Sequence, residues 1–475
     1  MKKLPLAIWA MVVGAFAMGA DEFIVAGVVR EIADDLGVTY GQVGALESFY
    51  ALGVAIGAPI FTTIGTRFGR RPMLLLTTLI FLAGNVISAL GPTYEVIMAG
   101  RLVSATAHGA FLGIAAVFAA ELVEPARKGR AIAIVFSGLT ASTVLGAPLG
   151  AAVGQAMGWR FTFWTLVVFG GVALLGLLAS LPRAAARSGD HHDEAHGPSH
   201  TGHASDLGDT HAAADVTEGL DAHALAHLGG GGQGPTMKEQ LGALTRPAVW
   251  GALLTTMLGY GGVFTSYVYI APQLTEVTGF DSQWVTPLLL LFGVGLFVGN
   301  ALGGKMADRA LKPAVLGSLT ALATVLFAMT LAIHSQAATV VMMFLFGVAA
   351  FSVVAPLQLR VMHSAGHAPD VASAANISAF TLGSAIGITL GGAAIDGGLG
   401  LSAVNWVGGI MTTAGLVVAV LTSVARRSGS EESSGRQHPG PVTSAAAGAS
   451  WPGADHAHDP QLVGSSRASE SHHHH

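Results

Sequence analysis

Twelve long apolar runs follow one another along the chain, and each is long enough to cross a bilayer. A membrane-spanning helix needs about 20 consecutive apolar residues. The runs lie at roughly 6–29, 42–64, 72–91, 94–118, 131–153, 160–181, 250–270, 285–304, 314–333, 339–359, 372–394 and 404–424. A hydrophilic segment separates the first six from the last six. The pattern predicts an all-α integral membrane protein with twelve transmembrane helices in two pseudo-symmetric six-helix halves.

The hydrophilic segments set the expected boundaries. We expect an N-terminal half at 1–182, a linker at 183–245, a C-terminal half at 246–427 and a tail at 428–475. Residues 189–235 contain no aromatic residue, so the linker cannot bury enough apolar surface to offset the entropy of ordering, and we expect disorder there and in the tail. The linker holds eight histidines without a fixed ligand spacing, so a solvated linker is favoured over a metal site.

Composition and charge exclude a soluble protein and place both ends on one side. The 475 residues are 52% hydrophobic and 11% charged, with mean hydropathy +0.59. Lys and Arg concentrate in alternate loops, which predicts cytoplasmic termini in a multi-pass protein of the plasma or inner membrane. Cysteine is absent, and the net charge of −5 gives no indication of a nucleic-acid partner.

A short basic segment occurs between spans in both halves. The first copy contains Arg67, Gly69, Arg70 and Arg71, and the second contains Gly304, Asp308 and Arg309. Duplicated membrane bundles are typical of secondary transporters, whose halves rock about a central site.

The two basic segments and the fifth span resemble sequence motifs of the major facilitator superfamily. Within that superfamily, they resemble the twelve-span drug:proton antiporters. The superfamily's loop pattern is Gly-x-x-x-Asp-Arg-x-Gly-basic-basic. The first copy departs from it at Thr62 and Thr66, so the acid that locks the outward-facing state in the family is missing there. The fifth span reproduces the family's antiporter pattern, with Gly146, Pro148 and Gly150 among its residues. Within the superfamily, the chain is most similar to chloramphenicol-resistance and arabinose-efflux-like exporters.

Ionisable residues at membrane depth lie only in the first half. A charge in the membrane is costly unless it is paired or hydrated, so each is a functional candidate. They are Asp21, Glu22, Glu47, Arg101 and His108. At about 1.5 Å rise per residue, Glu22, Glu47 and Arg101 come to similar depths, which predicts a charge cluster for proton coupling.

Within that cluster, Glu22 corresponds to the family's acid and Asp21 is an additional charge about 100° away around the helix. His108 lies two turns from Arg101 on the same face and is either a proton relay or substrate contact, or a helix-packing residue. A purely structural tie between Arg101 and one acid remains the alternative reading of the cluster.

The resemblance also implies that spans one, four, seven and ten line the substrate cavity. These spans offer mostly aromatic residues, either as a cavity lining or as ordinary packing: Phe16, Phe23, Phe111, Tyr260, Phe264, Tyr267 and Gln358. Such a lining favours amphipathic, mostly neutral compounds over free sugars.

Glycines recur at i, i+4 spacing in the second, fifth, eighth and eleventh spans: Gly53/Gly57, Gly146/Gly150/Gly154, Gly295/Gly299/Gly303 and Gly383/Gly387/Gly391. We expect these smooth faces to form the seam on which the halves slide, with general helix packing as the alternative.

The combined features predict proton-coupled efflux of small amphipathic compounds such as chloramphenicol-like drugs. Export of sugars or purine nucleosides is one alternative, and a metal-responsive carrier gated by the His-rich linker is another. We expect no enzyme activity and no cofactor, with the proton gradient as energy source. We also expect no metal site. The predicted partners are a small-molecule substrate, protons and the lipid bilayer, and we expect a monomer.

Overall fold

The structure, a computed structural model, describes residues 5–124, 127–180, 242, 245–366 and 369–435; the side chains of 58–59, 62–67, 369–370 and 424–435 are outside this description. The predicted linker at 183–245 and most of the predicted tail therefore lie outside the described residues. Two compact units are found, Met1–Ala425 and Arg426–His475. The first unit contains the predicted N-terminal half and the predicted C-terminal half up to Ala425.

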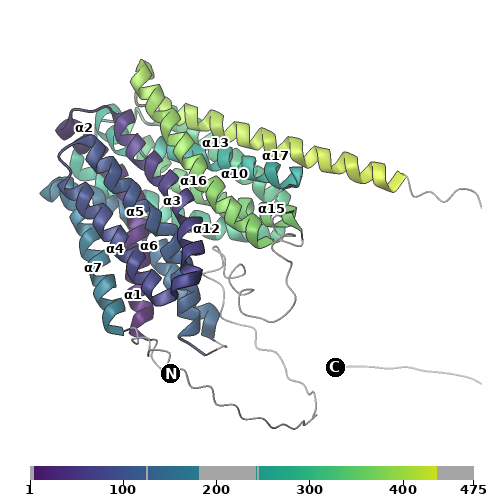
Figure 1. Ribbon diagram of the computed structural model, residues 1–475. Coiled ribbons are helices and arrows are strands. Elements are labelled where there is room, and N and C mark those ends of the chain that lie inside the picture. The colour runs from purple at the N-terminus through teal and green to yellow at the C-terminus, as the bar shows by residue number, and fades with distance from the viewer. Residues whose placement is uncertain (1–4, 125–126, 181–241, 243–244, 367–368, 436–475) are drawn as a thin grey trace, which may run out of the picture. The chain divides into compact units, whose positions relative to one another are not determined.

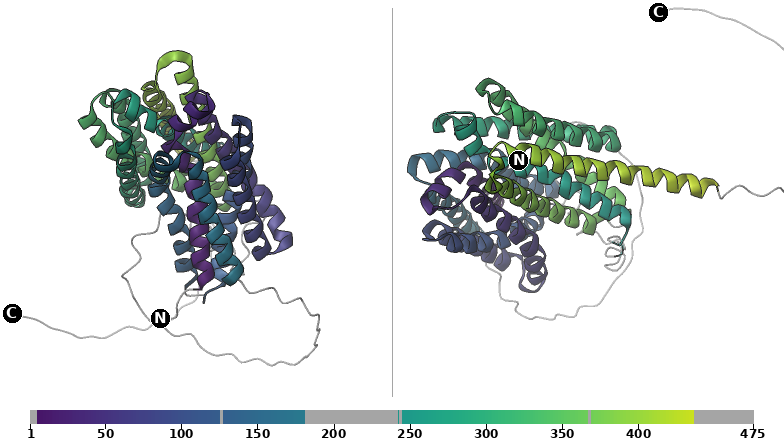
Figure 2. Two further views of the ribbon diagram at one scale, coloured as in Figure 1. Left: turned by 90° about the vertical axis from the view of Figure 1, so that its left-hand side faces the viewer. Right: turned by 90° about the horizontal axis from the view of Figure 1, so that it is seen from above.

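The described residues are helical throughout, without a strand. In the N-terminal half the elements are α1 (Leu6–Phe23), η1 (Ile24–Gly27), α2 (Val29–Leu36), α3 (Tyr40–Phe68), α4 (Arg70–Leu90), α5 (Tyr94–Glu121), α6 (Lys128–Met157) and α7 (Arg160–Ser180). In the C-terminal half they are α10 (Pro247–Tyr267), α11 (Ile270–Pro272), η3 (Gln273–Val277), η4 (Ser282–Trp284), α12 (Val285–Arg309), α13 (Leu311–Ala332), α14 (Gln336–Ser352), α15 (Val354–Ala365), α16 (Pro369–Ala394), η5 (Ile395–Leu399) and α17 (Ala403–Gly435). The two groups lie side by side (Figures 1 and 2).

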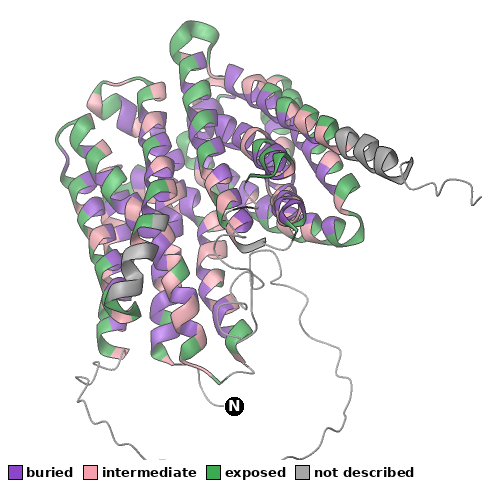
Figure 3. Ribbon diagram, turned by 45° about the vertical axis from the view of Figure 1, so that its right-hand side comes forward, coloured by how far each residue is buried: buried purple, intermediate pink, exposed green. Residues whose placement is uncertain are grey.

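Among the described residues, eleven helices are long and apolar enough to cross a membrane. The 29-residue α3 coincides with the second predicted span, so the predicted all-α membrane fold is confirmed. Exposed residues gather on outer helix faces and at helix ends (Figure 3). Exposed tryptophans lie near the starts of spans, as at Trp250 near the start of α10 and Trp284 before α12. Such placement is typical of residues at membrane interfaces.

Three spans differ in detail from the prediction. The first does not continue to residue 29, because α1 ends at Phe23 and a 3₁₀ turn and the short α2 follow. The tenth is divided at Val353 into α14 and α15. Helix α17 runs to Gly435, beyond residue 427, where the tail was expected to begin.

The two basic segments turn in different ways. Gly69 lies between α3 and α4 with φ +78°, a conformation that favours glycine, which explains the glycine of the first copy. In the second copy the chain turns at Ala310 with φ −162° and ψ 103°, an extended conformation that any residue adopts. Leu311 can therefore replace the second glycine of the pattern.

The glycine faces pack inside the halves, so the predicted seam is wrong in this respect. A Cβ placed on Gly57 would lie 2.4 Å from the backbone of Thr106 in α5, and one on Gly150 would lie 2.2 Å from the carbonyl oxygen of Ile24. In the C-terminal half, a Cβ on Gly299 would likewise lie against the backbone of α14, and one on Gly387 would lie against the backbone of α10. Each set of glycines therefore lets a span pack closely against another span of its own half.

The spans predicted to meet across the halves do meet. Helix α3 packs against α16, and α6 packs against α12. Other glycines allow the closest approaches there: Gly41 faces Gly392, and Gly293 faces the backbone of Val144. We call the end of the bundle opposite Leu6, which carries the loops at 37–39, 91–93 and 400–402, the distal end.

Candidate functional site

A buried ionic cluster joins three helices of the N-terminal half. Arg101 of α5 is fully buried, and its Nη1 is ion-paired with the carboxylate of Asp21 in α1. Its Nη2 donates a hydrogen bond of 2.6 Å to Glu47 Oε1 in α3. The structure thus brings together three of the residues singled out from the sequence.

Two further hydrogen bonds connect the cluster to α1 and to α4. Arg101 Nη1 also donates to the main-chain carbonyl of Asp21 at 3.0 Å, within the last turn of α1 before the 3₁₀ segment. The amide of Asn85, buried in α4, donates to Asp21 Oδ2 at 3.2 Å. Asp21, expected to be an additional charge, is therefore a direct partner of Arg101.

Tyr50 links the cluster to His108. The guanidinium carbon of Arg101 lies 4.2 Å from the centre of the Tyr50 ring, a cation–π contact. The Tyr50 hydroxyl lies 3.0 Å from His108 Nδ1 and also donates to the carbonyl of Met18 at 3.3 Å. His108 therefore contacts the tyrosine on which Arg101 stacks and does not touch the carboxylates.

Glu22 stands apart from these pairs. It is half-buried, and in the described part of the chain it makes no hydrogen bond or ion pair to another side chain. It lies within electrostatic range of Arg101 and of two tyrosines of α10, Tyr260 and Tyr267. Glu22 is therefore the acid of this group outside the ion pairs of Arg101, and it shares with Glu47 a position within electrostatic range of Tyr267.

An aromatic cluster begins beside Glu22 and crosses between the halves. Phe23 of α1 lies 6.2 Å from Phe264 and 5.9 Å from Tyr267, measured between ring centres. Further contacts extend it through the C-terminal half: Tyr260 to Phe380, Tyr267 to Phe292, and Phe292 to Phe346. An acid and an aromatic surface thus lie next to each other where α1 meets α10.

Three predicted cavity residues lie outside this cluster. Phe16 packs edge-to-face on Phe169 of α7 at 5.1 Å. Phe111 is fully buried against Gly14, where a Cβ would lie 2.5 Å from its ring. Gln358 donates to Ser373 and accepts from Asn376, both in α16.

Polar contacts close the distal end between the halves. Tyr40 of α3 donates to Glu276 of η3, Gln155 of α6 donates to the carbonyl of Ser282, and Ser48 of α3 donates to the carbonyl of Ala385 in α16.

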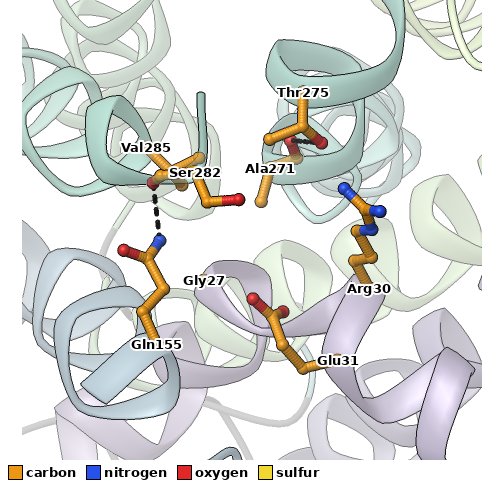
Figure 4. A pocket seen from close by; sticks show the side chains of 8 residues that line it. All are labelled: Gly27, Arg30, Glu31, Gln155, Ala271, Thr275, Ser282 and Val285. Carbon is orange, nitrogen blue, oxygen red and sulfur yellow. Dashed lines mark hydrogen bonds between the residues drawn. The ribbon is translucent and has the colours of Figure 1, made fainter. Parts of the chain in front are cut away.

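Near these contacts a small pocket lies between the halves (Figure 4). It is lined by Gly27, Arg30, Glu31, Gln155, Ala271, Thr275, Ser282 and Val285. Burial raises the pKa of the Glu31 carboxyl, which reaches into this space from α2.

The basic segments lie at the opposite end of the bundle. Arg70 at the start of α4 is ion-paired with Glu121 at the end of α5, within one half. Asp308 and Arg309 are exposed at the end of α12, Gly304 is half-buried there, and Arg71 is half-buried in α4. The side chain of Arg67 is outside the description. Among the described residues, no group of three or more His, Cys, Asp or Glu side chains could hold a metal ion.

Tyr50 and Asn85 were not predicted from the sequence, although the position of each carries a signal. Tyr50 follows Glu47 by three residues on one helix face, so the two side chains point in a similar direction. Asn85 is a polar residue deep in an apolar span, where such a residue is expensive without a partner.

Comparison with known proteins agrees with this architecture. The Major Facilitator Superfamily is matched over residues 11–388. The inner membrane transport protein YdhP of Escherichia coli is 35% identical over 425 residues, covering 90% of this chain and 97% of YdhP. A chloramphenicol resistance protein of Streptomyces lividans is 31% identical over 418 residues, covering 88% of this chain and 96% of that protein. The transporter AraJ of Escherichia coli is 30% identical over 401 residues, covering 84% of this chain and 89% of AraJ.

Proposed function

Because the chain belongs to the major facilitator superfamily and is a multi-pass membrane transporter, we propose that it exports small amphipathic compounds in exchange for protons. Chloramphenicol-like drugs are the leading substrate class. The observation that carries this proposal is the position of Glu22, between a buried ionic cluster and an aromatic surface shared by the two halves.

The charge balance of the cluster favours proton binding. Three carboxyl groups, Asp21, Glu22 and Glu47, lie around one buried guanidinium. Arg101 is engaged by Asp21 and Glu47, so an ionised Glu22 adds a negative charge without a cation of its own. Excess negative charge at membrane depth is expensive, and each proton that binds lowers it by one.

Substrate and proton then compete through one surface. An amphipathic substrate that packs on the rings beside Glu22 and donates a hydrogen bond to its carboxylate favours the ionised form, so its binding favours proton loss, whereas the carboxyl left without that donor after substrate release binds a proton again. Because Phe23 belongs to one half and Phe264 to the other, movement of the halves changes this surface. Alternating access between the two sides follows from that arrangement.

The same transport cycle accounts for the energy source and the oligomeric state. The proton gradient supplies the energy, so no cofactor is required, and a monomer is sufficient because the site is built from one chain. The positions of Lys and Arg in the loops favour cytoplasmic termini.

The two alternatives have less support. Sugar or nucleoside export requires several free polar side chains, whereas Gln358 is already bonded to Ser373 and Asn376. A metal-gated carrier depends on the His-rich linker, which lies outside the described residues.

Transport by everted membrane vesicles tests the proposal. Vesicles that contain the protein should accumulate labelled chloramphenicol when respiration energises them, and an uncoupler should abolish the accumulation. A panel with chloramphenicol, a pentose and a purine nucleoside separates the substrate classes. Accumulation that persists with the uncoupler contradicts proton coupling, and accumulation of the pentose alone contradicts the substrate class.

A further inference from the structure

The carboxylate of Asp396 caps a helix of the other half. Asp396 lies in η5, directly after α16 of the C-terminal half, and accepts a hydrogen bond of 2.8 Å from Thr39 Oγ1. It also accepts from the main-chain N–H of Gly41 at 3.4 Å. Thr39 is the N-cap residue of α3, and its hydroxyl oxygen accepts from the N–H of Gln42 at 3.1 Å.

This contact combines hydrogen bonds with a favourable charge. The first N–H groups of a helix lack partners inside the helix, and the aligned peptide dipoles make that end positive. A carboxylate placed there satisfies a donor and stabilises the helix end. Here the carboxylate comes from the opposite half, so the stabilisation exists only while the halves are together.

The two backbones approach closely at this contact. A Cβ on Gly41 would lie 2.2 Å from Asp396 Oδ2 and 3.0 Å from the carbonyl of Gly392. A Cβ on Gly392 would lie 2.7 Å from Gly41 Cα. Glycine at both positions lets the two backbones come close enough for the carboxylate to reach the helix end.

We propose that Asp396 is a latch, which holds the distal end closed and must release α3 each time that end opens. This inference rests on the proposed alternating-access cycle, but it concerns the balance between two conformations and not the substrate. Tyr40, next to Thr39, donates to Glu276 of the C-terminal half and adds a second contact of the same kind. The removal of the latch should therefore increase the fraction of molecules that are open at the distal end.

A cysteine at position 48 reports this opening. Ser48 is 5% exposed and is covered by Ala385 and Thr389 of α16, so a thiol there reacts only when α3 and α16 separate. The chain contains no cysteine, so Ser48→Cys gives a single labelling site. The rate of maleimide labelling is measured on the full-length protein in nanodiscs, without substrate.

Asp396→Ala should raise the labelling rate about tenfold. This corresponds to a change of about 1.4 kcal/mol in the free-energy difference between the closed and open conformations of the distal end. Thr39→Val should raise it several-fold, since the donor is lost, whereas Thr39→Ser keeps the hydroxyl and should label like the parent. Asp35→Ala is the matched control, because Asp35 pairs with Arg160 within one half at the same end.

An unchanged labelling rate in Asp396→Ala overturns the latch. An equal increase in Asp35→Ala also overturns it, since general loosening of the distal end then explains the effect. If Asp396→Ala does not yield folded protein, Asp396→Asn, which keeps the shape of the side chain but loses its charge, is compared with Asp35→Asn by the same two criteria. Since labelling requires no substrate, this result is independent of which compound the protein exports.

Discussion

The two halves have the same packing scaffold but different interiors. Gly53 packs on Leu102 in the first half as Gly295 packs on Phe344 in the second, and Gly57 packs on Thr106 as Gly299 packs on Val348. By this correspondence, Met343 occupies the position of Arg101. Both residues are fully buried, yet only one of them is charged.

The two halves also differ in the kind of polar side chain that they bury. The C-terminal half contains buried neutral networks, such as that of Gln273, which accepts from Asn405 and donates to the carbonyl of Ser266. The N-terminal half keeps an ionic cluster at a position where its counterpart packs with apolar side chains. If the scaffold does not require charge there, the charge is available for the proposed proton coupling.

The largest effect is expected from Arg101→Met, which copies the counterpart residue. It leaves Asp21 and Glu47 buried without their cation, and loss of one partner of a buried pair typically costs about 3–5 kcal/mol. We expect a strong loss of folded protein, measured by size-exclusion chromatography and thermal unfolding.

A companion variant makes this test sharper. Asp21→Asn, Glu47→Leu and Arg101→Met together neutralise the whole cluster, so the fold should recover while proton-driven transport stays absent. If the triple variant unfolds like the single one, the scaffold does require the charges, and our comparison of the halves is wrong.

The next largest effect is expected from Glu22→Gln, which keeps the shape of the side chain but removes its titrating proton. Uncoupler-sensitive accumulation in vesicles should fall at least about tenfold, while thermal stability stays close to that of the parent because Glu22 makes no pair to lose. Glu31→Gln at the distal end is the matched control. A Glu22→Gln protein with normal coupled transport would contradict the proposed role.

Two glycines distinguish packing within a half from packing between halves. Gly150→Ala inserts a methyl group against the carbonyl of Ile24 within the first half, so it should lower stability by about 1–3 kcal/mol. Gly293→Ala inserts one against Val144 across the halves, which should instead favour the distal-open conformation. Unfolding temperature and labelling at Ser48→Cys separate the outcomes. Equal losses of stability in both variants would remove the distinction.

The smallest effect is expected from the surface pair of Asp35 and Arg160. The hydrogen bond from Arg160 lowers the pKa of the Asp35 carboxyl, so the pair stabilises the protein above the ordinary aspartate value of about 4 and is lost as the pH falls further. Because the pair is partly exposed, Asp35→Asn should cost less than about 1 kcal/mol near neutral pH. Thermal unfolding at pH 7 should therefore change little, and a large change would show that the distal end depends on this pair.

The sequence predicted where the helices and the charged residues lie better than it predicted which residues and helices contact one another. Length and hydropathy place the spans, and depth along three helices brings Arg101 level with Glu47. The rotation of α1 could not be obtained in this way, since an angle of about 100° between Asp21 and Glu22 fixes their separation but not which one faces Arg101. Glycine spacing likewise predicts a smooth face, but it does not say which helix packs there.

All three members of the buried cluster come from the first 101 residues, which matters while the chain is being made. Arg101 follows Asp21 by 80 residues, so at about 5–20 residues per second the cation is synthesised roughly 4–16 seconds after the acid. Asp21 and Glu47 must be kept out of the lipid without their cation only during this interval. The ion pairs of Arg101 can be complete before the ribosome begins the second half, which then folds against a partner in which Asp21 and Glu47 already have their cation.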